Sequence, residues 1–210
     1  MTRSTYGKQT KGDQHRESEL GWPLMLLLAI SKMAGVYVCV MVLVAFPENK
    51  IIESVCYMLV TYLAASSMMD LPGAIAKLMG IQLLVHFRNP FASASMEEFW
   101  SKRWNRMASS TLRDAVYWPM VNLSGLQKNT PFRMLAALTT FVVSGIMHEM
   151  ILYMMTGQVT LRWFWFFTLH GLATLVESVA VQLMPGLKPH CTRLALWLFF
   201  IVTCHFLFFP

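Results

Sequence analysis

Five long apolar runs limit what this chain can fold into. They cover about residues 24–46, 51–69, 134–155, 161–184 and 194–209. A helix needs about twenty apolar residues to cross a bilayer core of roughly 30 Å. Hydrophobic residues make up 56% of the chain and charged residues 13%, against about 45–50% and about 25% in a soluble domain. We therefore expect an all-α, polytopic transmembrane helix bundle of about five spans, with lipid covering much of its surface.

Helix-breaking residues follow the second run. Asp70, Pro72 and Gly73 predict that its helix ends there. The next apolar stretch, residues 74–85, is too short to cross a bilayer and is expected to be an interfacial or re-entrant extension. Lys32, inside the first run, must reach an interface or face a polar interior.

Charge is distributed unevenly between the runs. Residues 1–21 are polar and are expected to form a disordered tail, whereas residues 22–210 are expected to form one membrane domain. Seven basic and three acidic residues lie between residues 88 and 133. Under the positive-inside rule this loop is cytosolic, and a nucleic-acid partner is not expected.

The four cysteines are far apart and contain no CxxC pair, which favours neither a disulfide framework nor a metal site.

A basic, Trp-rich segment spans residues 89–106. Ser95 and Glu98 have capping-box spacing, so a helix is expected from about Met96, with Trp100 and Trp104 on one face together with Met107. One interpretation is an interfacial amphipathic helix that lies in the headgroups. The other is a ligand site, because the Asn105 amide can fix a ligand. The basic residues of the segment can receive the phosphates of a nucleotide-bearing acyl donor; they are Lys102, Arg103 and Arg106.

The third run contains a histidine, His148, with Ser144 four residues earlier on the same helix face and Glu149 about 100° away. A neutral imidazole that bridges two helices is one interpretation. A general base is the other, because imidazole has the right acidity to take a proton from an alcohol. In the fourth run His170 is a rival base, with Glu177 seven residues later on nearly the same face.

Several motifs resemble one known family. They are Phe99-Trp100-Ser101-Lys102-Arg103-Trp104-Asn105, Val116-Tyr117-Trp118-Pro119, Ser144-Gly145-Ile146-Met147-His148-Glu149, Phe167-Thr168-Leu169-His170-Gly171 and a closing Leu207-Phe208-Phe209-Pro210. Their order resembles the wax-synthase branch of the membrane-bound O-acyltransferases, and long-chain-alcohol O-fatty-acyltransferases of plants in particular. The resemblance covers about residues 22–210.

The resemblance implies a multi-pass enzyme of the endoplasmic reticulum that moves a fatty acyl group from acyl-CoA to a long-chain alcohol, or in some relatives to a sterol. It implies that His148 is the general base and that Asn105 positions the thioester, without a metal or a bound cofactor. Glu149, Ser144, His170 and Glu177 are supporting or alternative residues. Acyl-CoA would contact the Trp-rich segment, through Trp100, Lys102, Arg103, Trp104 and Arg106.

Two departures from the family pattern matter. Ser101-Lys102 stands where the family usually has Gly-Arg, and family members are longer, so a shortened chain with reduced activity is expected. Two other classes remain open: an inactive membrane protein that binds lipid, and a transporter. The latter is suggested by charged residues at membrane depth, namely Lys32, Asp70, Glu149 and Glu177.

Overall fold

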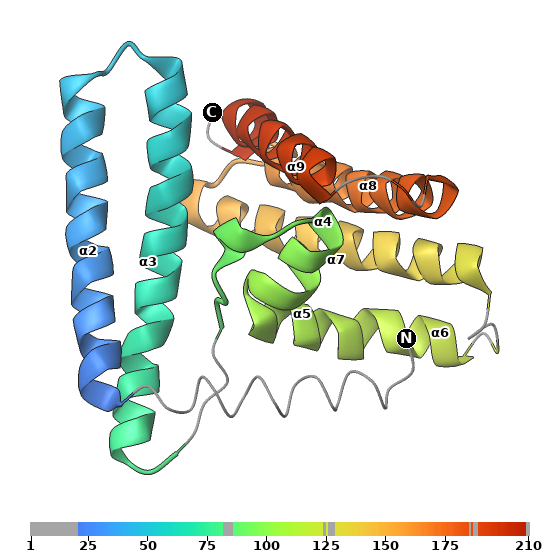
Figure 1. The fold of residues 1–210 in the computed structure, drawn as a ribbon, viewed down its shortest axis with the longest axis horizontal. Helices are drawn as coiled ribbons and strands as arrows, with labels where there is room; N and C mark the ends of the chain where they lie inside the picture. The colour runs from blue at the N-terminus through green and yellow to red at the C-terminus, as the bar shows by residue number, and fades with distance from the viewer. Residues whose placement is uncertain are drawn as a thin grey trace. The chain divides into compact units, whose positions relative to one another are not determined.

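The computed structural model describes residues 21–81, 86–123, 125, 129–184, 186 and 189–208. All regular structure in these residues is helical (Figure 1). Four helices there are long and apolar enough to cross a membrane: Trp22–Ala45, Lys50–Leu78, Thr130–Thr156 and Arg162–Leu183. A shorter apolar helix covers Thr192–Leu207, in the region of the fifth predicted span. The predicted all-α, polytopic fold is confirmed. The predicted tail lies almost wholly outside the described residues.

The chain divides into two compact units, residues 1–86 and 87–210. The expectation of one domain over residues 22–210 stays a prediction.

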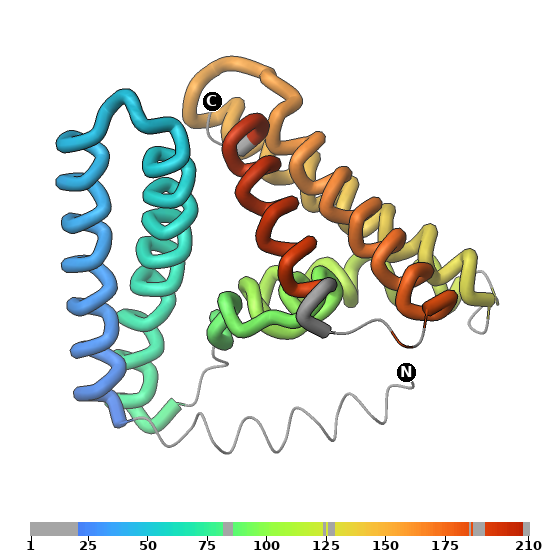
Figure 2. Tube along the Cα trace, turned by 45° about the horizontal axis from the view of Figure 1, so that its top comes forward, coloured from blue at the N-terminus to red at the C-terminus, as the bar shows by residue number. Residues whose placement is uncertain are grey.

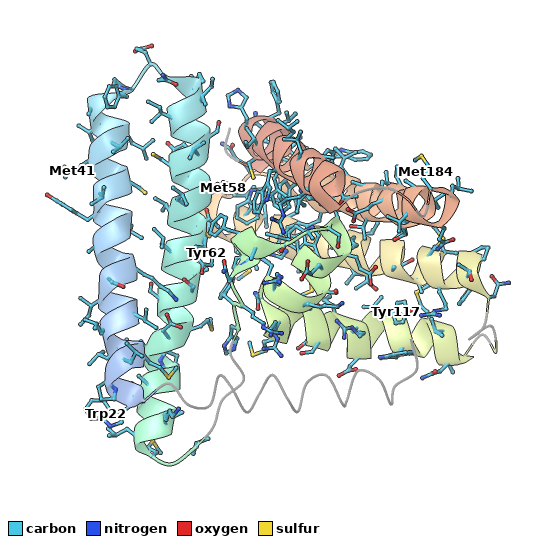
Figure 3. The ribbon with its side chains drawn as sticks, viewed as in Figure 1. Trp22, Met41, Met58, Tyr62, Tyr117 and Met184 are labelled. Atoms are coloured by element: carbon cyan, nitrogen blue, oxygen red, sulfur yellow. The ribbon has the colours of Figure 1, made fainter. Side chains whose placement is uncertain are left out.

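The first unit is a helical hairpin of α2 (Trp22–Ala45) and α3 (Lys50–Leu78). Asn49 caps α3 by accepting hydrogen bonds from the backbone N–H groups of Ile51 and Ile52. Only two residues of α2 are buried, Ala29 and Cys39, and Figure 3 shows Met41 projecting on the side away from α3. An apolar helix this exposed fits a lipid environment.

The predicted break at Pro72 is wrong, because α3 runs through it as one helix. Contacts with α2 on both sides of the proline hold the helix together. Asp70 forms an ion pair with Lys32, and a Cβ on Gly73 would lie 2.8 Å from the Met25 methyl group, so the two helices touch there. The proline removes one backbone donor, whereas ending the helix in lipid would leave several groups unpaired.

The second unit contains the Trp-rich segment and the antiparallel pair α7 (Thr130–Thr156) and α8 (Arg162–Leu183), which lie side by side in Figures 1 and 2. Glycines permit their close approach. A Cβ on Gly145 would lie 2.9 Å from the Phe164 carbonyl oxygen, and one on Gly171 would lie 2.8 Å from the Phe141 Cβ. Small residues bring membrane helices together in this way.

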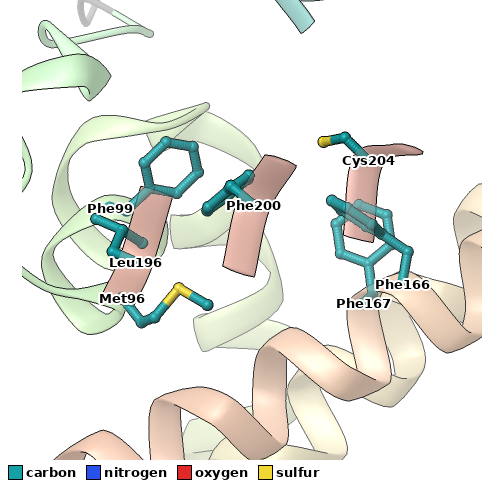
Figure 4. Packing of buried hydrophobic residues seen from close by; sticks show 7 residues of the cluster. All are labelled: Met96, Phe99, Phe166, Phe167, Leu196, Phe200 and Cys204. Carbon is teal, nitrogen blue, oxygen red and sulfur yellow. The ribbon is translucent and has the colours of Figure 1, made fainter. Parts of the chain in front are cut away.

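Short segments precede this pair, namely η1 (Pro90–Ala92), α4 (Met96–Glu98), the π-helical η2 (Phe99–Arg103), α5 (Arg106–Leu112), the π-helical η3 (Arg113–Tyr117) and α6 (Trp118–Leu123). Helix α9 (Pro189–Thr203) and the π-helical η4 (Cys204–Phe208) follow it. A buried core joins four parts of the unit (Figure 4): Met96 and Phe99, Phe166 and Phe167 of α8, Leu196 and Phe200 of α9, and Cys204. This core fixes the Trp-rich segment against α8 and α9.

Candidate functional site

A cavity of about 230 Å³ lies inside the second unit. One face of α7 forms a wall, with lining residues at helical spacing: Ala137, Thr140, Phe141, Ser144 and His148. The Trp-rich segment and α5 line it as well, and α8 contributes Phe167 and Thr174. The residue pair singled out from the sequence, His148 and Asn105, therefore lines one cavity.

The tautomer of His148 follows from its contacts. Its Nδ1 lies 2.7 Å from the Ser144 carbonyl oxygen, which can only accept a hydrogen bond, so Nδ1 carries the proton of the neutral ring. Nε2 then keeps its lone pair. The ring packs on Phe167 with centroids 4.1 Å apart, and Trp163 lies edge-on at 6.0 Å. His148 is thus held by aromatic neighbours, with one basic nitrogen available.

Asn105 occupies a left-handed backbone conformation, with φ of 34°. It caps α5, because its Oδ1 accepts a hydrogen bond of 3.2 Å from the backbone N–H of Ala108. Asparagine tolerates this conformation better than most residues. Since the carbonyl oxygen of the side chain is used in the cap, its amide NH₂ is the group left to act as a donor.

The expected continuous helix from Met96 through Met107 is wrong. Its start is confirmed, since the Ser95 hydroxyl accepts a hydrogen bond from the Glu98 backbone N–H at 3.0 Å. The backbone then widens into the π-helical η2, which ends at Arg103, and the left-handed Asn105 restarts the chain as α5. Met107 is consequently exposed, whereas Trp100, Trp104 and Asn105 line the cavity. π-Helical turns are frequent at functional sites.

Glu98 stabilises the start of this segment through a hydrogen bond and an ion pair. Its carboxylate accepts a hydrogen bond from the Ala94 backbone N–H at 2.8 Å and forms an ion pair with Arg103 at 2.7 Å. Burial alone would raise the pKa of the Glu98 carboxyl, but the Ala94 hydrogen bond and the Arg103 charge outweigh it, so the pKa lies below its ordinary value. Arg103 also donates to the carbonyl oxygens of Arg88 and Asn89. It therefore ties the segment to the preceding loop.

The five residues predicted to bind acyl-CoA lie in different places. Trp100 and Trp104 line the cavity, and the Trp100 indole N–H has no hydrogen-bond acceptor among the described residues. Arg106 is buried, and Lys102, Arg103 and Arg106 are not among the lining residues. The acyl-CoA role of all five residues stays a prediction.

Glu149 caps the start of the neighbouring helix, α8. Its buried carboxylate accepts hydrogen bonds from the backbone N–H groups of Thr160 (2.7 Å), Leu161 (2.6 Å) and Trp163 (3.2 Å), and from the Thr160 hydroxyl. A negative charge suits a helix N-terminus. Since Trp163 and Phe167 of α8 contact the His148 ring, this cap holds the start of the helix that supports His148.

Glu177 has a similar role at the other end of α8. Its carboxylate accepts hydrogen bonds from the backbone N–H groups of Met96 (2.7 Å) and Glu97 (3.4 Å). These are the first residues of α4. The α8 carboxylate thereby anchors the Trp-rich segment to α8.

His170, the rival base, is fully buried and is not among the cavity-lining residues. Its Nδ1 lies 2.7 Å from the Phe166 carbonyl oxygen, and its Nε2 lies 3.4 Å from the Thr203 hydroxyl. The alternative partner considered from the sequence, Glu177, is instead bonded to α4. His170 therefore packs α8 against α9.

Comparisons with known proteins point to one family. Residues 85–169, which include Asn105 and His148, match the family model described as "Membrane bound O-acyl transferase family". The chain belongs to this family. Its relatives include a probable long-chain-alcohol O-fatty-acyltransferase 8 of Arabidopsis thaliana, 34% identical over 73% of this chain and 47% of the relative. An acyl-CoA--sterol O-acyltransferase 1 of the same plant is 32% identical over 97% of this chain and 59% of the relative.

The chain spans about half the length of the curated relatives it matches. Their names indicate the wax-synthase-like branch of the membrane-bound O-acyltransferase family.

Some residues that line this cavity were not predicted from the sequence, among them Ser109, Arg113 and Tyr117. Lining residues of α5 and its two flanking residues recur at helical spacing: Asn105, Ala108, Ser109, Leu112 and Arg113. Had Asn105 been read as a helix cap, a helix starting at Arg106 would have put these residues on one face.

No metal site is evident in the part of the chain that the structure describes, where no three His, Cys, Asp or Glu residues are grouped closely enough to hold an ion.

Proposed function

We propose that this protein transfers a fatty acyl group from acyl-CoA to a long-chain alcohol and forms a wax ester. The main observation behind this proposal is that His148 and Asn105 line the same cavity in the second unit. Membership of the membrane-bound O-acyltransferase family and the relatives named as long-chain-alcohol acyltransferases support it.

The proposed reaction begins with the alcohol. Nε2 of His148 takes the hydroxyl proton while the alcohol oxygen attacks the thioester carbonyl carbon. The tetrahedral oxyanion then collapses, the C–S bond breaks, and the imidazolium returns the proton to the coenzyme A sulfur. The products are the ester and free coenzyme A. General base catalysis of this kind contributes roughly 10²–10⁴ in rate.

Asn105 is proposed to stabilise the oxyanion. Its side-chain oxygen accepts a hydrogen bond from the Ala108 N–H. We therefore propose that its NH₂ group donates a hydrogen bond to the oxyanion. A preorganised donor of this kind is worth about 10²–10³ in turnover. Oriented donors act most strongly where water is excluded, and the apolar walls of this cavity, which include Phe141, Phe167 and Trp100, favour exclusion.

Lipid substrates suit the surroundings of the cavity. Each CH₂ of a fatty chain favours the membrane by about 0.8 kcal/mol, so the alcohol and acyl chain are expected to arrive through the bilayer. We propose that Trp100 and Trp104 form the wall along the thioester and that the nearby basic residues assist with the phosphates of acyl-CoA. The endoplasmic reticulum is the proposed membrane.

A sterol acceptor is the second candidate. The relative named as a sterol O-acyltransferase aligns over 97% of this chain, a larger share than the long-chain-alcohol acyltransferases quoted above.

The test uses microsomes from yeast deleted for endogenous sterol and wax acyltransferases that express the full-length protein. Radiolabelled acyl-CoA is supplied with a long-chain alcohol or with a sterol, and labelled esters are separated by thin-layer chromatography. Wax ester that disappears in His148→Ala at equal protein level supports the proposal, and sterol ester alone supports the second candidate. A folded protein that forms neither ester with any acyl-CoA length would overturn both.

A further inference from the structure

Arg113 connects the two segments that flank Asn105. Arg113 lines the cavity, and its Nη2 lies 3.2 Å from the Ser101 carbonyl oxygen and 3.4 Å from the Ser109 hydroxyl oxygen. Ser101 precedes Asn105 by four residues and Ser109 follows it by four. Both acceptors also line the cavity, so the guanidinium bridges the corner at which Asn105 sits.

The corner needs such a bridge. Asn105 joins the π-helical η2 to α5 in a left-handed conformation with φ of 34°. Non-glycine residues in this conformation cost of order 1–3 kcal/mol. Asparagine lies at the low end of this range because it tolerates the left-handed region better than most residues, and contacts around the corner stabilise it further. The Ala108 N–H fixes the end of the Asn105 side chain, while Arg113 ties η2 to α5.

The chemistry of arginine fits this task. A guanidinium is planar, always charged and carries several N–H donors in a fixed fork, so it can serve two acceptors from one position. A lysine ammonium keeps the charge but lacks the fork. Upstream of the corner, Arg103 makes a comparable tie through Glu98 and the loop carbonyls.

We propose that Arg113 is a positioning residue that holds the Asn105 amide in its orientation toward the cavity. This inference rests on the proposed role of Asn105 in acyl transfer. Arg113 acts through Asn105 and does not itself bind the acyl donor.

The kinetic test compares Arg113→Gln and Arg113→Lys with the wild type. A displacement of about 1 Å at a reacting group can cost about 10²-fold, so Arg113→Gln is expected to lower kcat at least about tenfold while the KM for acyl-CoA stays within about twofold. Arg113→Lys is expected to recover part of kcat. Added to Asn105→Ala, Arg113→Gln is expected to cause no further loss. Arg162→Gln, which removes an exposed arginine at the start of α8, is the matched control and keeps wild-type kinetics.

Two kinetic results would overturn the inference. Unchanged kcat in Arg113→Gln would show that the bridge is dispensable. A raised KM for acyl-CoA with kcat intact, absent with a phosphate-free acyl thioester, would assign Arg113 to donor binding instead.

Hydrogen exchange provides a test that does not depend on activity. The Ala108 and Ser109 amides bond to the Oδ1 and the backbone carbonyl of Asn105. Arg113→Gln is expected to accelerate their exchange at least tenfold, with little change in peptides from α7. Unaltered exchange there would refute the inference whatever the activity. If Arg113→Gln accelerates this exchange but the wild-type protein makes no ester, the structural role of Arg113 is supported and only the proposed function is contradicted.

Discussion

Removing the Glu149 carboxylate is expected to destabilise the protein more than removing any exposed carboxylate. Glu149 is 7% exposed and accepts three backbone hydrogen bonds and one hydroxyl hydrogen bond at the start of α8. Leu161, the residue that precedes α8, supplies no cap from its own side chain. The first turn of α8 therefore depends on a side chain from α7.

The magnitude follows from the donors left behind. Each buried donor without an acceptor costs about 1–3 kcal/mol, and water or a local shift can satisfy some of the four. We expect Glu149→Ala to lower the free energy of unfolding by about 3 kcal/mol. For a chain of this length that corresponds to roughly 6–12 °C in transition temperature. Glu149→Gln keeps one acceptor and is expected to cost less.

The assay is thermal unfolding in detergent, followed by size-exclusion chromatography of the fluorescently tagged protein. Glu53→Ala is the matched control, because Glu53 forms a solvent-accessible pair with Lys50 three residues away in the same helix, and such pairs are worth about 0–1 kcal/mol. If Glu149→Ala and Glu53→Ala unfolded at the same temperature, the account of the α7–α8 turn would be refuted.

Two further predictions concern other parts of the second unit. Glu98, whose pKa lies below its ordinary value of 4.5, contributes stability that is present above about pH 4.5 and is lost as the pH falls through its folded pKa. The difference in transition temperature between wild type and Glu98→Gln should therefore shrink below about pH 4.5, and a difference that grows there would contradict the Arg103 pairing. Gly145→Ala places a Cβ 2.9 Å from the Phe164 carbonyl oxygen and should cost about 1–3 kcal/mol. A Cβ on Gly186 would meet no atom of the described residues within 4 Å, so Gly186→Ala should be neutral by the same thermal assay.

The membrane fold could be predicted from the sequence because apolar length is a local property. A run of twenty apolar residues has few alternatives in lipid, so three of the four long helices were found to within four residues at each end. The exception is α3, which runs to Leu78, well beyond the predicted end at about residue 69. The predicted break at Pro72 was wrong because contacts with another helix, α2, stabilise α3 on both sides of the proline. Two residues of α2 make these contacts: Lys32 pairs with Asp70, and Met25 contacts Gly73. The sequence around Pro72 does not reveal them.

In the candidate site, too, features that depend on local sequence could be predicted, whereas features that depend on the tertiary fold could not. His148 and Asn105 could be selected by residue type and motif, and the cavity brings them together. The left-handed backbone of Asn105 and the bridge by Arg113 depend on the fold of residues 99–113 and were not foreseen. The assignment of Glu149 and Glu177 as caps of other segments likewise required knowing which helices are neighbours.

The most direct measurement compares two histidines of one protein. His148 lines the cavity, whereas His170 is fully buried outside its lining. Initial rates of ester formation from acyl-CoA and a long-chain alcohol would be measured for His148→Gln and His170→Gln, each normalised to folded protein. We expect His148→Gln to lose at least about 100-fold and His170→Gln to keep its rate per folded molecule. Retained activity in His148→Gln, with activity lost in folded His170→Gln, would contradict the account.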